Sequence, residues 1–267
     1  MHGNIASLVD STGVPLNKSG ILGVVSAGGG PTTRIDITTD NFSQTGSLSG
    51  WSVDDTNEKA TATWNRNTTV QSIWMDLADY LGEDIGDTWN LRYHIKLASN
   101  FSNLTTGCGV YLVTGLYNQS GVFSSHSATA LSGSTFVAEA CVSAGGCSYD
   151  NQQRLYPFID DATTYEASSN SSLPTNTAFW TANGKEAYIE VIRDNGDVTM
   201  NMYSDNFETL YTNGSATMSG TYTTDDLTHL ILFHNYNYAV GTCDAVANFE
   251  IDAVYFNNNS TDAGAPF

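Results

Sequence analysis

The chain has 267 residues, 40% of them hydrophobic and 14% charged, and its 28 Asp and Glu residues outnumber its 9 Lys and Arg residues to give a formal net charge of -19. This length and apolar content suffice for one large β domain. The charge argues against a nucleic-acid partner, because phosphate binding needs clustered Lys and Arg. The absence of any run of about 18 apolar residues argues against membrane insertion.

Most of the polarity comes from uncharged side chains. The chain contains 27 Ser, 32 Thr and 24 Asn residues. Thr favours strands, whereas Ser, Asn and Gly favour turns. The composition therefore predicts an all-β protein.

Residues 1–33 are predicted to form an extended N-terminal arm, and residues 34–267 the β domain. The arm is poor in aromatic residues and ends in a Gly-rich linker, Gly28-Gly29-Gly30-Pro31. Its apolar patches, Ile5–Val9 and Ile21–Val25, suggest docking on a sister subunit in a homo-oligomer; a disordered tail is the alternative. Neither patch reads as a signal peptide, so an external protein would be a processed chain or part of a virion.

From residue 34 onward, hydrophobic residues recur with a period of two, as in half-buried strands. The pattern covers 89–97, 187–191 and 198–202, and it predicts a hairpin turn at Asp194-Asn195-Gly196-Asp197 between the last two. Near the end of the chain, Phe249, Ile251, Ala253 and Tyr255 are expected on one face. Residues 73–81 are a helix candidate, with a strand followed by a loop as the alternative, and Asn213-Gly214 signals a turn.

The order of these segments resembles the concanavalin A-like or laminin-G-like jelly rolls over about residues 40–257. The segments that carry the resemblance are 40–43, 50–53, 74–77, 89–97, 188–193, 198–205, 227–233 and 249–256. The resemblance implies that the chain folds as a two-sheet antiparallel jelly-roll sandwich. Residues 117–180 are more polar and are expected to form an insert of loops or an edge hairpin.

The four cysteines, Cys108, Cys141, Cys147 and Cys243, allow two disulfides in three pairings. A Cys141–Cys147 bridge would close a short Gly-rich loop, leaving Cys108 and Cys243 to pair or stay free. A zinc site is disfavoured because no C-x-x-C pair is present. Disulfides favour an extracellular or virion-surface location. The ten Asn-x-Ser/Thr sequons, the last two beginning at Asn258 and Asn259, are a modest excess over the number that the composition predicts and would be glycosylated only in a host with that machinery.

One pair of carboxylates suggests catalysis. Glu250 and Asp252 alternate on one strand face, as in glycoside hydrolases that resemble this sandwich. The further acid of that pattern would fall at Val254 or Tyr255, so the set is incomplete. We therefore expect no enzyme activity, with a glycoside hydrolase or lyase as the alternative.

Calcium is the cofactor that the sequence suggests, although it requires none. The acidic pairs Asp54-Asp55 and Asp225-Asp226 offer the hard oxygen ligands that calcium prefers. They match no fixed calcium-loop spacing, and paired Asp residues in turns are often simply solvated.

Sugar binding is suggested by aromatic and amide side chains near one predicted strand end. Tyr236 and Tyr238 alternate with Asn235 and Asn237, and aromatic faces and amides are the groups that bind pyranose rings. Trp180 is a second candidate. Core packing is the competing explanation for aromatic residues, and it is the one expected for Trp51, Trp64, Trp74 and Trp89.

Together these features predict a non-enzymatic, surface-exposed structural or adhesion module with glycan-binding capacity. It would belong to a virion, as a capsid-decoration or receptor-binding protein, or to a cell surface. A free secreted carbohydrate-binding module is a further alternative, and it predicts a monomer.

Overall fold

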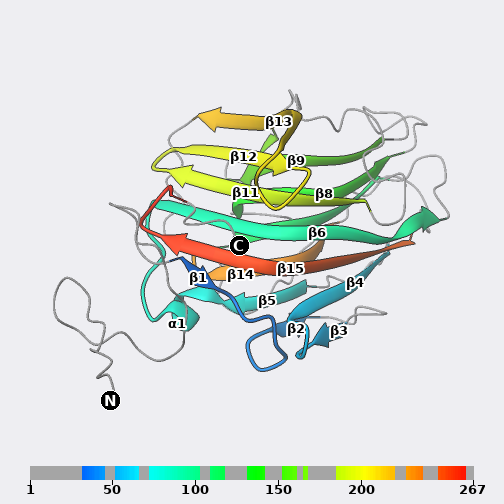
Figure 1. Cartoon of the computed structure of the whole chain (residues 1–267), viewed down its shortest axis with the longest axis horizontal. Coiled ribbons are helices and arrows are strands. Elements are labelled where there is room, and N and C mark those ends of the chain that lie inside the picture. The colour runs from blue at the N-terminus through cyan, green and yellow to red at the C-terminus, as the bar shows by residue number, and fades with distance from the viewer. Residues whose placement is uncertain are drawn as a thin grey trace, which may run out of the picture.

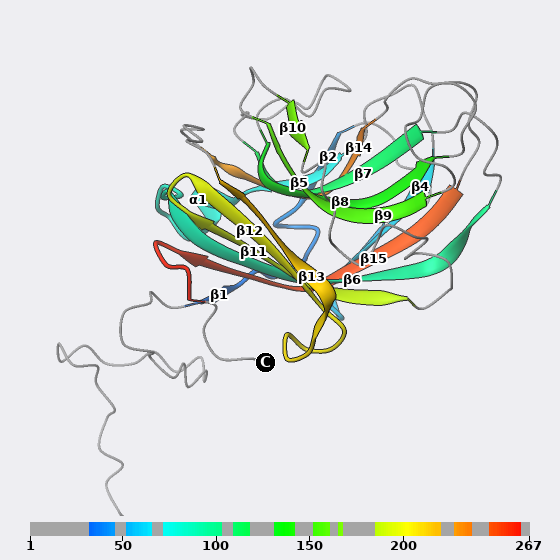
Figure 2. The ribbon, with the colours of Figure 1, turned by 90° about the horizontal axis from the view of Figure 1, so that it is seen from above.

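Two antiparallel β-sheets lie face to face in the computed structural model (Figures 1 and 2). The structure describes residues 32–45, 52–65, 72–102, 109–117, 131–141, 152–160, 165–167, 185–219, 227–236 and 246–262. The predicted all-β, two-sheet antiparallel sandwich is confirmed. The predicted N-terminal arm lies outside the described residues except for Thr32 and Thr33.

Strands dominate the described chain, and the helix in it is short. The elements are β1 (Thr33–Arg34), β2 (Ser43–Thr45), β3 (Ser52–Asp54), β4 (Lys59–Asn65), β5 (Ser72–Asp76), α1 (Leu77–Leu81), β6 (Thr88–Ser102), β7 (Gly109–Tyr117), β8 (Leu131–Cys141), β9 (Gln152–Asp160), β10 (Tyr165–Ala167), β11 (Glu186–Asp194), β12 (Asp197–Tyr203), β13 (Leu210–Ser219), β14 (His229–Tyr236) and β15 (Val246–Asn258). Within the described ranges, no helix has the length and apolar character needed to cross a lipid bilayer.

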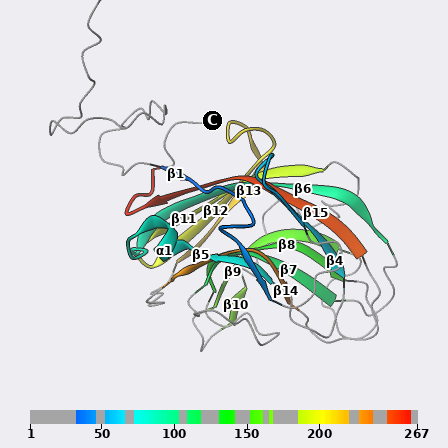
Figure 3. The ribbon, with the colours of Figure 1, turned by 90° about the horizontal axis from the view of Figure 1, so that it is seen from below.

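Each sheet combines strands from both halves of the chain. The eight-stranded sheet has the order β13-β12-β11-β6-β15-β4-β3, with β1 paired to β15. The seven-stranded sheet has the order β10-β9-β8-β7-β14-β5-β2. Residues 117–180, expected as a polar insert, contribute β8, β9 and β10, which lie side by side in Figure 3.

The core fills the space between the sheets and follows the predicted alternation. Trp89, Leu91, Tyr93, Ile95 and Leu97 of β6 are all buried, as are the alternate apolar residues of β11 and β12. Burying these side chains stabilises the fold by about 25 cal/mol for each Å² of apolar surface removed from water. The side chains between them point to the opposite face of the sheet.

The predicted hairpin turn joins β11 to β12. Asp194 pairs with Asp197, and Asn195 adopts a φ of 55°, a left-handed conformation that Asn tolerates better than most residues. The tight turn fixes the register of the two strands along their whole length, from the pair Asp194–Asp197 to the pair Tyr188–Tyr203.

Residues 73–81 contain both a strand and a helix. β5 ends at Asp76, whose side chain accepts a hydrogen bond from the Asp79 amide at the start of α1. Gly82 ends α1 in a left-handed conformation with a φ of 71°. These caps explain why the helix is confined to five residues.

Two sequence-based expectations about local structure are wrong. Ala253 has a φ of 51° at a bulge in β15, so Val254 and Phe256 are buried while Tyr255 is only half-buried. Asn213-Gly214 lies within β13, in a bulge where residues 211–214 face the single residue Met202 of β12. In both places a bulge interrupts the ladder, which a strict period of two does not anticipate.

Candidate functional site

Two of the five predicted glycan-binding residues lie at the end of β14, and the other three lie outside the described part of the chain. Asn235 and Tyr236 are the last residues of β14, and their backbones pair with Leu112 and Tyr111 of β7. Tyr238, Asn237 and Trp180 lie outside the described residues. Their role as ligand-binding residues remains a prediction.

The outward face of the seven-stranded sheet carries aromatic side chains near the opposite end of β14, which begins at His229. Trp74 of β5 pairs with Ile231 of β14, and His229 pairs with Asp76 and Tyr117. Because Ile73 and Met75 point into the core, the alternate residue Trp74 lies on the side turned away from the other sheet. The Trp74 and His229 rings lie 5.2 Å apart. Trp74 packs against the core, as expected, and stays partly exposed.

His229 is a buried polar residue of this face. Its Nδ1 atom lies 2.6 Å from the Thr228 hydroxyl, and its Nε2 atom lies 3.9 Å from an Asp76 carboxylate oxygen. Burial lowers the pKa of His229 below its ordinary value of 6.5, against the opposing influence of the Asp76 and Asp79 charges. The imidazole is therefore held in its neutral form, in which it can both donate and accept a hydrogen bond.

The described candidate calcium ligands are already hydrogen-bonded to the protein. Asp54 accepts hydrogen bonds from the Thr56 and Asn57 amides and from the Asn57 side chain, which lower its pKa. Asp55 accepts two bonds from Thr39, each of 2.8 Å. Among the described residues, no group of three or more His, Cys, Asp or Glu residues is arranged to hold a metal ion. Asp225 and Asp226 lie outside those residues.

The predicted disulfide pairing stays a prediction, because only one of the four cysteines lies among the described residues. Cys141 is the last residue of β8, and its backbone pairs with Gly109, which directly follows Cys108 in the sequence. Cys108, Cys147 and Cys243 lie outside the described residues.

The carboxylates considered for catalysis lie on the outward face of the eight-stranded sheet, and both have partners. Glu250 Oε1 lies 3.4 Å from Lys59 Nζ. Asp252 Oδ1 lies 2.7 Å from His94 Nδ1, while His94 Nε2 lies 3.3 Å from Glu186 Oε2. The bulge at Ala253 sends the next alternate position, Val254, into the core.

These residues belong to a cross-strand pattern that spans three strands. The central strand β6 presents Arg92, His94 and Lys96, flanked by residues of β11 and β15. In the strand register, Lys96 lies opposite Glu186 of β11 on one side and opposite Glu250 of β15 on the other. Cross-strand pairs of opposite charge stabilise a sheet by a few tenths of a kcal/mol to about 1 kcal/mol each. The positions of Glu186, Glu250 and Asp252 are therefore explained by their role in stabilising the sheet.

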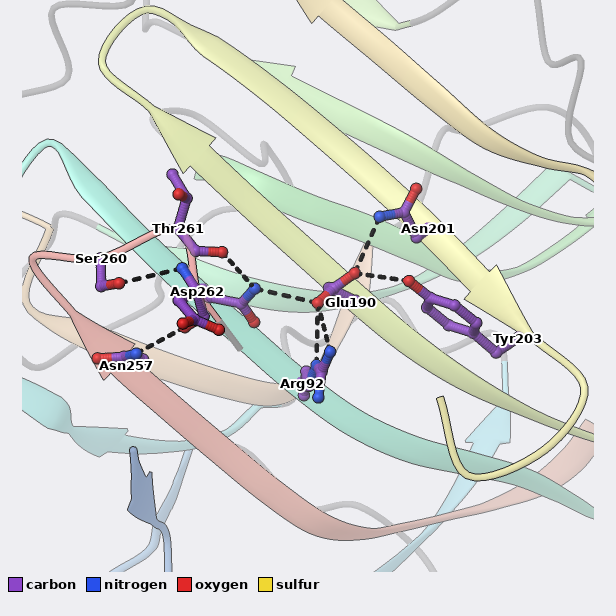
Figure 4. Close-up of polar contacts among 9 residues, drawn as sticks. Arg92, Glu190, Asn201, Tyr203, Asn257, Ser260, Thr261 and Asp262 are labelled. Atoms are coloured by element: carbon purple, nitrogen blue, oxygen red, sulfur yellow. Dashed lines mark hydrogen bonds and ion pairs between the residues drawn. The ribbon is translucent and has the colours of Figure 1, made fainter. Parts of the chain in front are cut away.

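The same face contains a buried charged cluster around Glu190 (Figure 4). Glu190 Oε1 accepts hydrogen bonds from Asn90 and from Arg92, whose Nε and Nη2 atoms lie 2.9 and 2.8 Å away. Its Oε2 atom accepts bonds from Asn201 and the Tyr203 hydroxyl at 2.9 and 2.8 Å. Burial alone would raise the pKa of Glu190, but the Arg92 charge and these hydrogen bonds lower it. The same burial and the Glu190 charge raise the pKa of Tyr203.

A loop between β12 and β13 covers this cluster from the solvent side. Phe207 is only 8% exposed although it lies in a loop. The centroid of its ring lies 4.7 Å from the Arg92 guanidinium carbon, in a cation–π contact. Its edge contacts Tyr188, at a centroid distance of 5.4 Å. Phe207 has a φ of 61°, which a bulky residue rarely adopts, so these contacts hold the loop in place.

The Glu190 cluster was not predicted from the sequence. Its partners lie about 100 residues away on β6 and 11 to 13 residues away on β12. The alternation does place Glu190 on the polar face of its strand, but a solvated glutamate would produce the same pattern.

Comparison with solved structures finds lectins and lectin-like proteins. The Emp47p carbohydrate recognition domain matches with a TM-score of 0.49 and 11% identity over 85% of this chain and 94% of that chain. Arcelin-5, a lectin-like defense protein from Phaseolus vulgaris, matches at 0.49 and 10% over 86% and 99%. The VIP36 exoplasmic/lumenal domain in a Ca2+/Man3GlcNAc-bound form matches at 0.45 and 9% over 83% and 87%. All three TM-scores are below 0.5, and the fold of this chain is defined by its own strand pairing.

No protein-family profile matches the chain, and no curated protein does. The fold class therefore rests on the strand pairing itself, and the function must be argued from the side chains.

Proposed function

We propose that the chain is a non-enzymatic, surface-exposed module that binds glycan on the outward face of the seven-stranded sheet, along strands β5 and β14. The observation that carries the proposal is Trp74, which stays partly exposed on that face while its strand neighbours Ile73 and Met75 are buried. The sequence-predicted residues Asn235 and Tyr236 are on β14, the strand paired with β5.

The chemistry of this face suits a sugar. A partly exposed indole ring offers an apolar surface on which the C–H face of a pyranose can stack. The partly exposed Asp76 carboxylate lies on the same face as Trp74 and supplies hydrogen-bond acceptors, while the buried His229 ring packs near the indole. A few polar groups around an aromatic surface are typical of small-molecule sites. Asn235, Tyr236, Asn237, Tyr238 and Trp180 would complete the site.

A glycan array with the full chain tests this proposal, followed by titration of the best-bound glycan. Trp74→Ala and Tyr236→Ala should each weaken binding about tenfold, equivalent to about 1.4 kcal/mol. Tyr211→Ala is the matched control, because Tyr211 is a half-buried aromatic residue on the other sheet. Unchanged affinity in the Trp74 variant, or equal losses in all three variants, would contradict the site.

The biological setting is part of the same proposal. An external location, on a virion or a cell surface, is supported by the four cysteines and the acidic composition. Residues 1–31 would anchor the sandwich to sister subunits. A free secreted carbohydrate-binding module would have the same sugar site but would remain a monomer.

Calcium would be an accessory to this site rather than a catalyst. Asp54 and Asp55 would have to exchange hydrogen bonds to Asn57, Thr56 and Thr39 for a metal ion. We therefore place the calcium candidate at Asp225 and Asp226 in preference to Asp54 and Asp55.

A glycoside hydrolase or lyase remains the second candidate function. The specific observation in its favour is that Glu186, Glu250 and Asp252 share one sheet face beside His94. Incubating bound glycans with the full chain and looking for new reducing ends or unsaturated sugars separates this candidate from simple binding. Product formation that Glu250→Gln abolishes would favour the enzyme.

A further inference from the structure

Two overlapping glycosylation sequons lie where β15 ends. Asn258-Asn259-Ser260 and Asn259-Ser260-Thr261 both fit the Asn-x-Ser/Thr pattern. Because neighbouring asparagines share this segment, sequence alone does not distinguish them. The structure gives the two side chains opposite environments.

Asn258 is buried and fully hydrogen-bonded. Its side-chain nitrogen donates to Glu83 Oε1 at 2.9 Å and to the Asp84 carbonyl at 2.8 Å, and its oxygen accepts a bond from the Gly86 amide at 3.0 Å. An N-glycosidic bond replaces one of the two amide hydrogens. A glycan on Asn258 would therefore break one of these bonds and place a large hydrophilic group where the residue is 8% exposed.

Asn259 lacks the hydrogen bonds that hold Asn258, although its Oδ1 atom lies directly against Gly86. It is exposed in the turn after β15, with a φ of 59°, and its side chain forms no hydrogen bond with the described residues. The sequon hydroxyls differ in the same way. Thr261 is exposed, whereas Ser260 is 7% exposed and its hydroxyl accepts a bond from the Asp262 amide at 3.0 Å.

We propose that Asn259 is an N-glycan acceptor of this protein and that Asn258 is not. The donor class is an oligosaccharide linked to a lipid diphosphate. The C1–O bond to the diphosphate breaks, a C1–N bond to Asn259 Nδ2 forms, and the displaced amide proton leaves with the lipid diphosphate. Because Asn259 is exposed, its amide can carry a glycan while the hydrogen bonds that Asn258 makes with Glu83 and Asp84 stay intact.

Two single substitutions separate the sequons. Thr261→Ala removes the Asn259 sequon and keeps that of Asn258, whereas Ser260→Ala removes the Asn258 sequon and keeps that of Asn259. The full chain and both variants are secreted from a eukaryotic cell line. Glycans are then released with a peptide-N-glycosidase in 18O water, which marks each occupied asparagine for mass spectrometry.

We expect a glycan at Asn259 in the wild-type chain and in Ser260→Ala, and no glycan at either position in Thr261→Ala. A glycan on Asn258 in secreted wild-type or Thr261→Ala protein would overturn the proposal. So would an unoccupied Asn259 in the secreted wild-type chain. If Ser260→Ala is not secreted, the wild-type chain and Thr261→Ala still decide between these outcomes.

Discussion

At the scale of single residues, Glu190 keeps its negative charge in the interior because its partners replace the water that it loses. The carboxylate is 4% exposed and is bonded by Arg92, Asn90, Asn201 and Tyr203. Removing one member of a buried ion pair is costly because the remaining charge stays buried without its partner. The cluster therefore makes the outward face of the eight-stranded sheet intolerant of local change.

Glu190→Gln should lower the free energy of unfolding by about 3 kcal/mol. The amide leaves the Arg92 charge unpaired, and its NH2 group would face the Asn201 or Tyr203 donors. Urea unfolding measures the loss. Glu208→Gln, a change in the exposed part of the covering loop, should leave the stability unchanged. Equal stability of Glu190→Gln and wild type would mean that the Glu190–Arg92 ion pair contributes nothing to the free energy of unfolding.

His229 predicts a specific dependence of stability on pH. Its pKa in the folded protein is lowered from 6.5 by burial, so the folded state binds fewer protons than the unfolded state just below that pH. Stability is therefore fully present above about pH 6.5 and falls as the pH decreases through the folded pKa. In His229→Gln, stability measured by urea unfolding between pH 7.5 and 5.5 should fall less steeply than in wild type. If the stability of His229→Gln and that of wild type fall with the same slope, His229 is not the source of this pH dependence.

At the scale of elements, regular strands were predictable from the sequence and irregular ones were not. In β6, β11 and β12 the alternating apolar residues coincide with the buried face, because one face packs on the other sheet. In β15 the alternation breaks at Ala253, a residue type that gives no signal for a positive φ. The polar clusters were likewise unpredictable, since they depend on which distant strands become neighbours.

Gly214 shows how such an irregularity is maintained in β13. A Cβ atom at this position would lie 2.6 Å from the Met202 carbonyl oxygen and 2.7 Å from the Tyr211 carbonyl oxygen. Both are backbone atoms, so the clash requires the β12–β13 ladder to shift. Gly214→Ala should therefore destabilise the protein by about 2 kcal/mol, with faster amide exchange confined to these two strands.

Gly82→Ala is the matched comparison for that change. Gly82 also disfavours a side chain, but through its φ of 71° alone, because no atom lies within 4 Å of the added Cβ. Its cost should be about 1 kcal/mol. A larger loss for Gly82→Ala than for Gly214→Ala, in thermal or urea unfolding, would show that the steric argument for β13 is wrong.

At the scale of the whole molecule, the strand pairing joins both ends of the described chain to one sheet. β1 pairs Thr33 with Phe256 and Arg34 with Tyr255 of β15, and Asn90 of β6 bonds the Thr261 carbonyl. Thr33, assigned to the arm by the sequence, is therefore part of the sandwich. A shortened chain that retains the whole sheet must begin at Thr33 or earlier.

The final prediction concerns what residues 1–31 do. Their two apolar patches, 5–9 and 21–25, are set in an otherwise polar segment, and apolar surface is stabilised by burial against a partner. If the segment is an assembly element, light scattering should give an oligomer for the full chain and a monomer for a chain beginning at Thr32. Because subunits with a net charge of -19 repel one another, the oligomer should be favoured by added salt, which screens that repulsion. Monomers from both chains at every salt concentration would favour the free carbohydrate-binding module over the subunit of a surface assembly.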